Sequence, residues 1–107
     1  MKHAGTATLA ALEPLLAELR RRAALVERSP GAFYLKGKAF LHFHEDPAGT
    51  FADVKLDLEE FTRLRSTTQR EQAALVAAID RCLAAAETRP PRAGGAGRSS
   101  PSTRART

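Results

Sequence analysis

The strongest constraint on the fold is the alternation of apolar and polar side chains between Ala32 and Asp57. Five apolar residues share one parity: Phe33, Leu35, Ala39, Leu41 and Phe43. Successive side chains of a strand point to opposite faces, so a period of two predicts half-buried strands. Gly37 lies inside this run and marks either a turn between two strands or a bulge. We favour a three-residue loop or a bulge, because both keep the apolar set on one face.

A turn divides the segment into a hairpin. The sequence Asp46-Pro47-Ala48-Gly49 has Asp, Pro and Gly where a type I turn prefers them. This turn places His42 opposite Asp53, whereas a three-residue loop would mix the two faces. A slide to the next permitted register would pair His44 with Asp53 instead. The predicted apolar face carries Ala39, Leu41, Phe43, Ala52, Val54 and Leu56, and the second face carries Phe40, His42, His44, Phe51, Asp53 and Lys55.

A helical pattern precedes the hairpin. Spacings of three and four residues predict one helix from about Leu12 to just before Ser29, and Pro14 fits its first turn. Its apolar stripe consists of Leu9, Leu12, Leu16, Leu19, Ala23 and Val26. Arg20-Arg21-Arg22 lies outside this stripe. We therefore interpret the triplet as part of a solvent-exposed helix face, on which Arg22 can pair with Glu18.

Two capping boxes follow the hairpin. Asp57 with Glu60 predicts the start of a short helix, and Thr68 with Glu71 predicts the start of a long one. The long helix has an apolar stripe of Leu75, Val76, Ile79, Leu83 and Ala86, and it is expected to end at Arg89-Pro90-Pro91. Cys82 lies beside this stripe and is interpreted as a buried, inert thiol.

Together these elements predict one α+β domain over residues 1–88. It comprises an N-terminal helix, an antiparallel meander of two to three strands, a short helix and a C-terminal helix packed on one sheet face. Residues 89–107 lack acidic, aromatic and large aliphatic side chains, which predicts a disordered tail. The chain has 17 basic and 12 acidic residues, and the excess of five lies in this tail: Arg89, Arg92, Arg98, Arg104 and Arg106.

The second sheet face carries the one constellation that suggests chemistry. His42 and His44 point the same way on a strand, and with Asp53 across the ladder they could ligate zinc and leave one position open. We favour the alternative, a polar face with a histidine–carboxylate pair and no cofactor. Asp53 is then expected to raise the pKa of the facing histidine. Phosphate loops, serine elbows and CxxC pairs are absent from the sequence, so no catalytic residue is assigned.

The aromatic side chains of the same face suggest a partner. Tyr34, Phe40 and Phe51 would lie on a face that no remaining helix covers. The leading hypothesis is a non-catalytic module that binds itself or another protein. The second is nucleic-acid binding through the tail and this face, and the third is a metal-dependent enzyme at the histidine site. A single cysteine, no long apolar run and no signal-peptide pattern predict a cytoplasmic protein without a membrane partner.

Three short motifs resemble a known family. Lys36-Gly37-Lys38-Ala39-Phe40, the strand of residues 41–46, and Val54-Lys55-Leu56-Asp57 resemble the strand region of the MmcQ/YjbR family. That family has a GK-x-F turn, an LHED-like strand and a return strand ending in Lys, and the resemblance covers residues 33–64. It implies a CyaY-like α+β meander and the DNA-binding role proposed for those proteins. The His-x-His is not part of the family pattern, and the chain is also similar to small bacterial proteins of no assigned role.

Overall fold

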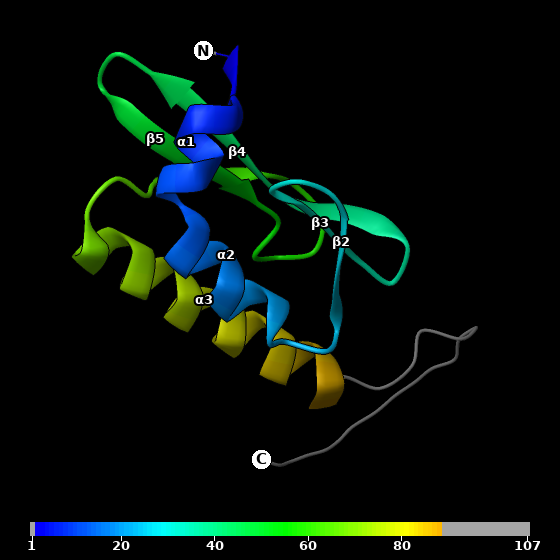
Figure 1. Ribbon diagram of the computed structural model, residues 1–107. Helices are drawn as coiled ribbons and strands as arrows, with labels where there is room; N and C mark the ends of the chain where they lie inside the picture. Colours follow the sequence, from blue (N-terminus) through cyan, green and yellow to red (C-terminus); the bar gives the residue numbers. More distant parts are fainter. Residues whose placement is uncertain (1, 89–107) are drawn as a thin grey trace.

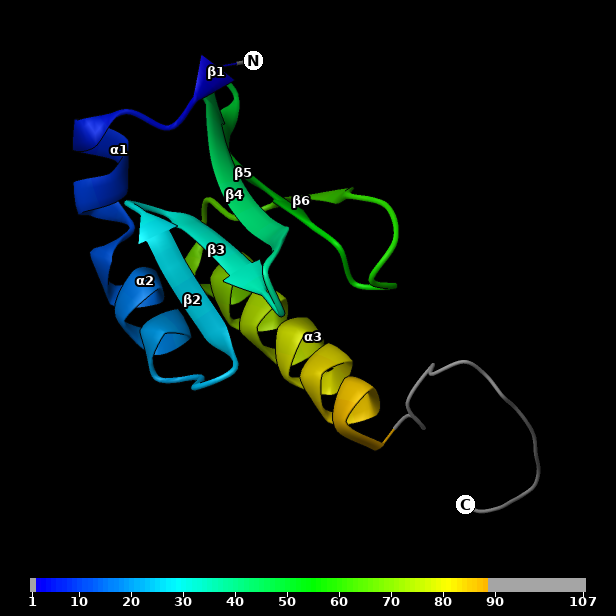
Figure 2. The ribbon, with the colours of Figure 1, turned by 90° about the vertical axis from the view of Figure 1, so that its right-hand side faces the viewer.

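A computed structural model describes residues 2–88 as helices packed on an antiparallel sheet (Figures 1 and 2). The elements are β1 (Lys2–His3), α1 (Thr6–Ala11), α2 (Glu13–Arg20), β2 (Leu25–Ser29), β3 (Ala32–Leu35), β4 (Lys38–Asp46), β5 (Gly49–Val54), β6 (Thr62–Arg65) and α3 (Gln69–Thr88). The sheet runs β2-β3-β4-β5-β6, and β1 pairs with β4. The predicted mixed α+β class is confirmed, but the sheet has six strands rather than two or three. The predicted tail and its arginines lie outside the described residues.

The β4–β5 hairpin has the predicted register. Leu41 pairs with Val54, His42 with Asp53, and Glu45 with Thr50, and the ladder continues to Asp46 and Gly49. The Asp46 side chain accepts a hydrogen bond from the Ala48 backbone N–H at 2.8 Å, which stabilises the turn. Local turn chemistry therefore sets which side chains of this hairpin face the helices.

A two-residue turn at Lys36 and Gly37 joins β3 to β4. Both residues have positive φ, 53° and 81°, as a type I′ hairpin turn requires. Leu35 then pairs with Lys38, and the register shifts before Phe33 pairs with Leu41. Neither alternative favoured at Gly37 is present: the turn has two residues instead of three, and the bulge of β4 lies further along the strand, at Phe40.

The bulge reverses the predicted orientation of Phe40. Tyr34 pairs with Ala39 and Phe33 with Leu41, so Phe40 is the unpaired extra residue of β4. Phe40 and Leu41 are both 1% exposed and both belong to the core. The prediction that Phe40 lies on the open face is wrong, because a strict period of two does not continue through a bulge.

The prediction of one long N-terminal helix is also wrong for the residues after Arg20. α2 ends there, and the chain returns as strand β2 along β3. Leu25 is buried while Val26 is 53% exposed, so side chains of this segment alternate instead of following the helical stripe. Pro14 does lie in the first turn of α2, as expected.

The predicted short helix after Asp57 is a turn followed by a strand. The Asp57 carboxylate accepts hydrogen bonds from the backbone N–H groups of Glu59 and Glu60, at 2.9 and 3.0 Å. Leu58 has a φ of 65°, so the chain turns instead of continuing as a helix. It then forms β6, whose Arg63 pairs with Asp53 of β5.

The capping box of the last helix is confirmed. The Glu71 N–H donates to Thr68 Oγ1 at 3.1 Å, and the Thr68 N–H donates to Glu71 Oε1 at 2.9 Å. α3 contributes buried Leu75, Ile79 and Cys82 to the core. Among residues 2–88, no helix combines the length and the apolarity that a membrane crossing requires.

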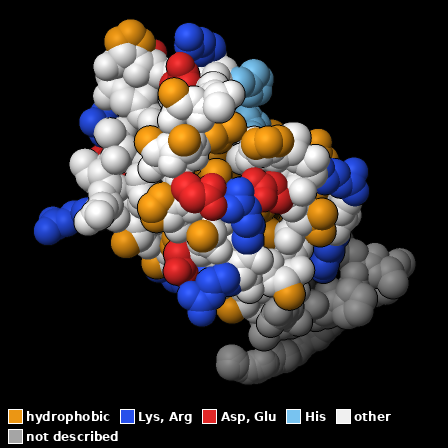
Figure 3. Space-filling view, in the orientation of Figure 1, with side chains coloured by type: hydrophobic (Ala, Val, Ile, Leu, Met, Phe, Trp, Pro, Cys, Tyr) orange, Lys and Arg blue, Asp and Glu red, His pale blue; other side chains and the backbone are white. Residues whose placement is uncertain are grey.

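The arginine triplet lies on a solvated face, as predicted. Arg22 contacts Glu18 at 3.2 Å and also forms a two-point contact with Asp80 of α3, at 3.0 and 2.8 Å. Arg20 bridges Glu13 and Glu27. Figure 3 shows acidic and basic side chains side by side over the helices. These arginines therefore serve intramolecular ion pairs that tie α2 to its neighbours.

Replacing Glu27 with Gln is expected to lower the free energy of unfolding by about 1–2 kcal/mol at neutral pH. The Glu27 carboxylate accepts from Arg20 at 2.6 Å and from the Gly31 N–H at 2.9 Å. The Arg20 hydrogen bond, aided by that N–H, lowers the pKa of Glu27 below its ordinary value of 4.5. Because this pKa is depressed, the stabilisation is present above 4.5 and lost as the pH falls through the folded value.

Urea unfolding of the wild type and the Glu27→Gln variant at neutral and acidic pH measures this difference. The control is Glu18→Gln, because Glu18 is about half exposed and pairs only at the surface. Its expected loss is under about 0.5 kcal/mol. Equal losses for the two variants, or a difference that persists in acid, would contradict the assignment.

Candidate metal centre

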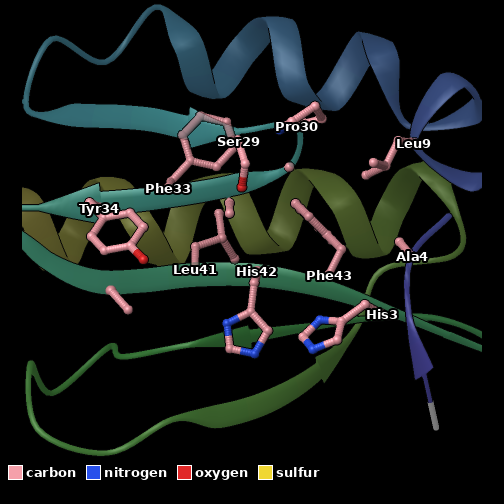
Figure 4. A pocket seen from close by; sticks show the side chains of 13 residues that line it. His3, Ala4, Leu9, Ser29, Pro30, Phe33, Tyr34, Leu41, His42 and Phe43 are labelled. Atoms are coloured by element: carbon pink, nitrogen blue, oxygen red, sulfur yellow. The ribbon is translucent and has the colours of Figure 1, made fainter. Parts of the chain in front are cut away.

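The three sequence-predicted site residues lie together on the sheet face that points away from the helices. His42 and His44 are alternate residues of β4, and Asp53 lies opposite His42 on β5. In Figure 4, His42 extends from β4 on the side away from the helices, while Leu41 and Phe43 extend toward them. The confirmed hairpin register is what brings these three side chains together.

The distances between the polar atoms suit a metal ion. Asp53 Oδ2 lies 3.0 Å from His44 Nε2 and 3.5 Å from His42 Nε2. One candidate ligand atom from each of the three residues lies within 4.8 Å of the other two. Two ligands of a tetrahedral zinc ion, with bonds of about 2.0–2.1 Å, are roughly 3.3 Å apart. The two histidine–carboxylate distances bracket that separation.

The His44 imidazole is buried without a hydrogen bond. The residue is 8% exposed, and within residues 2–88 neither ring nitrogen has a hydrogen-bond partner. The approach of Nε2 to Asp53 is short in distance but lacks hydrogen-bond geometry. A buried polar atom without a partner costs about 1–3 kcal/mol, so this ring requires an explanation.

Arg63 of β6 holds the Asp53 carboxylate in place. Its Nε and one terminal nitrogen donate to the two carboxylate oxygens at 2.7 and 2.8 Å. The Arg63 guanidinium thereby lowers the pKa of Asp53, which keeps the buried carboxylate ionised. Sequence reasoning missed Arg63 because it placed a short helix where β6 lies.

Asp53 acts to raise the pKa of the facing His42, as expected, but the pKa of His42 is nevertheless lowered overall. The pKa of His42 is lowered, first by burial of the ring and then by the charge of neighbouring His44. Asp53 does act to raise it, but these opposing effects are larger. The Phe61 ring packs edge-on against His42, with centroids 4.9 Å apart, and contributes to this apolar environment. His42 is thus held neutral, the form in which imidazole binds a metal.

A third histidine, His3, joins the site and was not predicted. β1 pairs with β4 so that His3 lies opposite His44. The ring centroid of His3 is 4.8 Å from that of His44 and 5.8 Å from that of His42. The chain has three histidines, and their rings lie together at this site. A strand of two residues is too short to show a periodic pattern in the sequence. The only sequence signal for including His3 was that the chain has just three histidines.

A pocket of about 380 Å³ lies beside His42 and Phe43 of β4. At these two residues, the edge of β4 has a gap between its pairing with β3 and its pairing with β1. His3 and His42 line its polar part (Figure 4). The remaining wall is largely apolar and includes Leu9, Phe33 and Phe43. Of the three candidate ligands, only His42 lines this cavity.

The predicted aromatic interaction face is only partly present. Phe40 is in the core, while Tyr34 and Phe51 are half-buried on the open face. The Arg28 guanidinium lies over the Tyr34 ring, 4.7 Å from its centroid. Phe61, at 41% exposure, is a more accessible aromatic residue than any of the three predicted. Binding of a second copy or another protein through this face stays a prediction.

Comparisons of this chain with family models, with curated proteins and with solved structures give no match. The resemblance to the MmcQ/YjbR family and the nucleic-acid role that it implies therefore stay predictions. The geometry of the site is the basis for a functional proposal.

Proposed function

We propose that this protein binds a divalent transition-metal ion of the zinc class through His42, His44 and Asp53. The observation that carries the proposal is the buried imidazole of His44, whose ring nitrogens make no hydrogen bond among the described residues, beside two further ligand groups. A metal ion would satisfy one of its ring nitrogens and remove much of the cost of burying it.

The protonation states of the site support this proposal. Metal binding requires neutral imidazole and ionised carboxylate. Burial disfavours the charged form of His42, and Arg63 favours the charged form of Asp53. Two nitrogen donors and one carboxylate oxygen suit zinc, cobalt, nickel or copper better than calcium or magnesium, which prefer oxygen ligands alone. Arg63 is the outer partner that orients the carboxylate.

Titration of the metal-free chain with Zn²⁺ and Co²⁺ tests the proposal. The full chain, purified without a polyhistidine tag, is expected to bind one ion. Replacing His44 with Ala is expected to weaken the affinity by at least about 100-fold, since a lost ligand exceeds the 10–100-fold cost of a lost outer partner. Calorimetry gives the affinity, and Co²⁺ absorption reports nitrogen coordination.

The matched control is Glu59→Gln, which removes an exposed carboxylate outside the cluster. This variant is expected to bind metal like the wild type. A wild type that binds no metal, or equal affinities for the wild type and the His44→Ala variant, would refute the proposed site.

A further inference from the structure

We infer that His3 supplies the fourth ligand, so that the bound metal fastens the N-terminal strand β1 to the sheet. This inference rests on the proposed metal site and defines what fills its remaining coordination position. It also assigns a role to a strand that is too short to be stable by itself.

The ring positions support a site shared by three histidines. Two imidazoles bound to one tetrahedral ion through bonds of about 2.0–2.1 Å have ring centroids roughly 5 Å apart. The observed centroid distances are 4.7 Å for His42 and His44, 4.8 Å for His3 and His44, and 5.8 Å for His3 and His42. The His3 ring is therefore close enough to share an ion with the other two, although it must turn for its nitrogen to join the group that His42, His44 and Asp53 already form.

The backbone of β1 places His3 beside the site. The Ala4 N–H donates to the Phe43 carbonyl at 3.1 Å, and the Gly5 N–H donates to the Glu45 carboxylate at 2.7 Å. Lys2 contacts Glu45 from the surface at 3.5 Å. These contacts fix the register, while the side chains of Lys2 and His3 themselves are exposed. Ordering each residue of the strand costs backbone entropy, so a ligand bond from His3 would contribute to holding the strand in place.

The fourth ligand determines the character of the site. With three protein ligands, zinc keeps a position for water, as catalytic sites do, whereas with four it is closed, as structural sites are. His3 and Ala4 also form part of the wall of the 380 Å³ pocket. Metal binding would therefore close the coordination shell and fix this wall in the same step. Metal binding would thus order the N-terminal segment against the sheet.

The test compares His3→Ala with Lys2→Ala, its neighbour on the same strand. His3→Ala is expected to weaken Zn²⁺ binding by at least about 10-fold and to alter the Co²⁺ absorption spectrum, while Lys2→Ala changes neither. Hydrogen exchange of the Ala4 amide, measured by NMR, is expected to slow at least about 10-fold when Zn²⁺ is added to the wild type. The same amide is expected to show no such response in the His3→Ala variant.

The outcomes separate this inference from the proposed function. One outcome is that the wild type and His3→Ala bind Zn²⁺ equally well and that hydrogen exchange of the Ala4 amide does not change with metal. This result refutes His3 as the fourth ligand and leaves the three-ligand site in place. Equal losses in both variants, with unchanged Co²⁺ spectra, would also refute ligation by His3. A wild type that binds no metal refutes both. His3 is exposed, so its replacement leaves the core intact, and circular dichroism checks the fold.

Discussion

Replacing Phe40 with Ala is expected to lower the free energy of unfolding by about 3–5 kcal/mol. The side chain is 1% exposed and packs in the core with its neighbour Leu41, because the β4 bulge turns both residues inward. Domains of this size have a total stability of about 5–15 kcal/mol, so the loss is a large part of the whole. A strictly alternating strand would instead place this ring in solvent and predict almost no effect.

Urea unfolding of the wild type and of Phe40→Ala measures this loss. Phe40→Leu, expected to lose about 1–1.5 kcal/mol, provides the same comparison if the alanine variant does not fold. Phe61→Ala is the control, since that ring is 41% exposed and its loss is expected to stay below about 1 kcal/mol. Similar small losses for Phe40 and Phe61 would contradict the bulge.

Replacing His44 with Leu is expected to stabilise the metal-free protein by about 1–3 kcal/mol while abolishing metal binding. Two buried ring nitrogens without hydrogen-bond partners are removed, and an apolar side chain of similar reach takes their place. The order of stabilities then reverses with metal. At a free Zn²⁺ concentration of about 1,000 times the dissociation constant, the wild type gains about 4.1 kcal/mol and the variant gains nothing.

Thermal or urea unfolding with a chelator and with added Zn²⁺ gives both stabilities. His42→Leu is the matched control on the same strand. The His42 side chain is 27% exposed and has no nitrogen among the buried unpartnered atoms, so its replacement should stabilise the metal-free protein less. Destabilisation by His44→Leu in the presence of chelator would show that the His44 nitrogens are satisfied in solution.

Short-range chemistry made part of this structure predictable. The Asp46–Gly49 turn fixes the hairpin register, and the Thr68–Glu71 box fixes the start of α3, because each depends on residues a few positions apart. The register alone places Asp53 opposite His42. These two local signals supplied the centre of the site and the last helix.

The remaining features depend on pairings that no local pattern encodes. Leu25 and Val26 fit a helical stripe as well as a strand, and only pairing with β3 makes them a strand. Arg63 reaches Asp53 because β6 adds to the sheet, although its Asp57 turn looks like a helix start. His3 meets His44 through a strand of two residues that lies some forty positions away in sequence. Tertiary context decides each of these cases.

The β4 bulge has a consequence for engineering the protein. β4 pairs with β3 from Lys38 to Leu41 and with β5 from Leu41 onward. His42 and His44 are thus positioned by β5, and His44 also by β1, without contact to the β3–β4 turn. Space around Gly37 is open, since an added Cβ there would meet no atom within 4 Å. The Lys36–Gly37 turn is consequently the natural insertion point for a fluorophore or linker peptide, at which extra length leaves the histidine cluster in place.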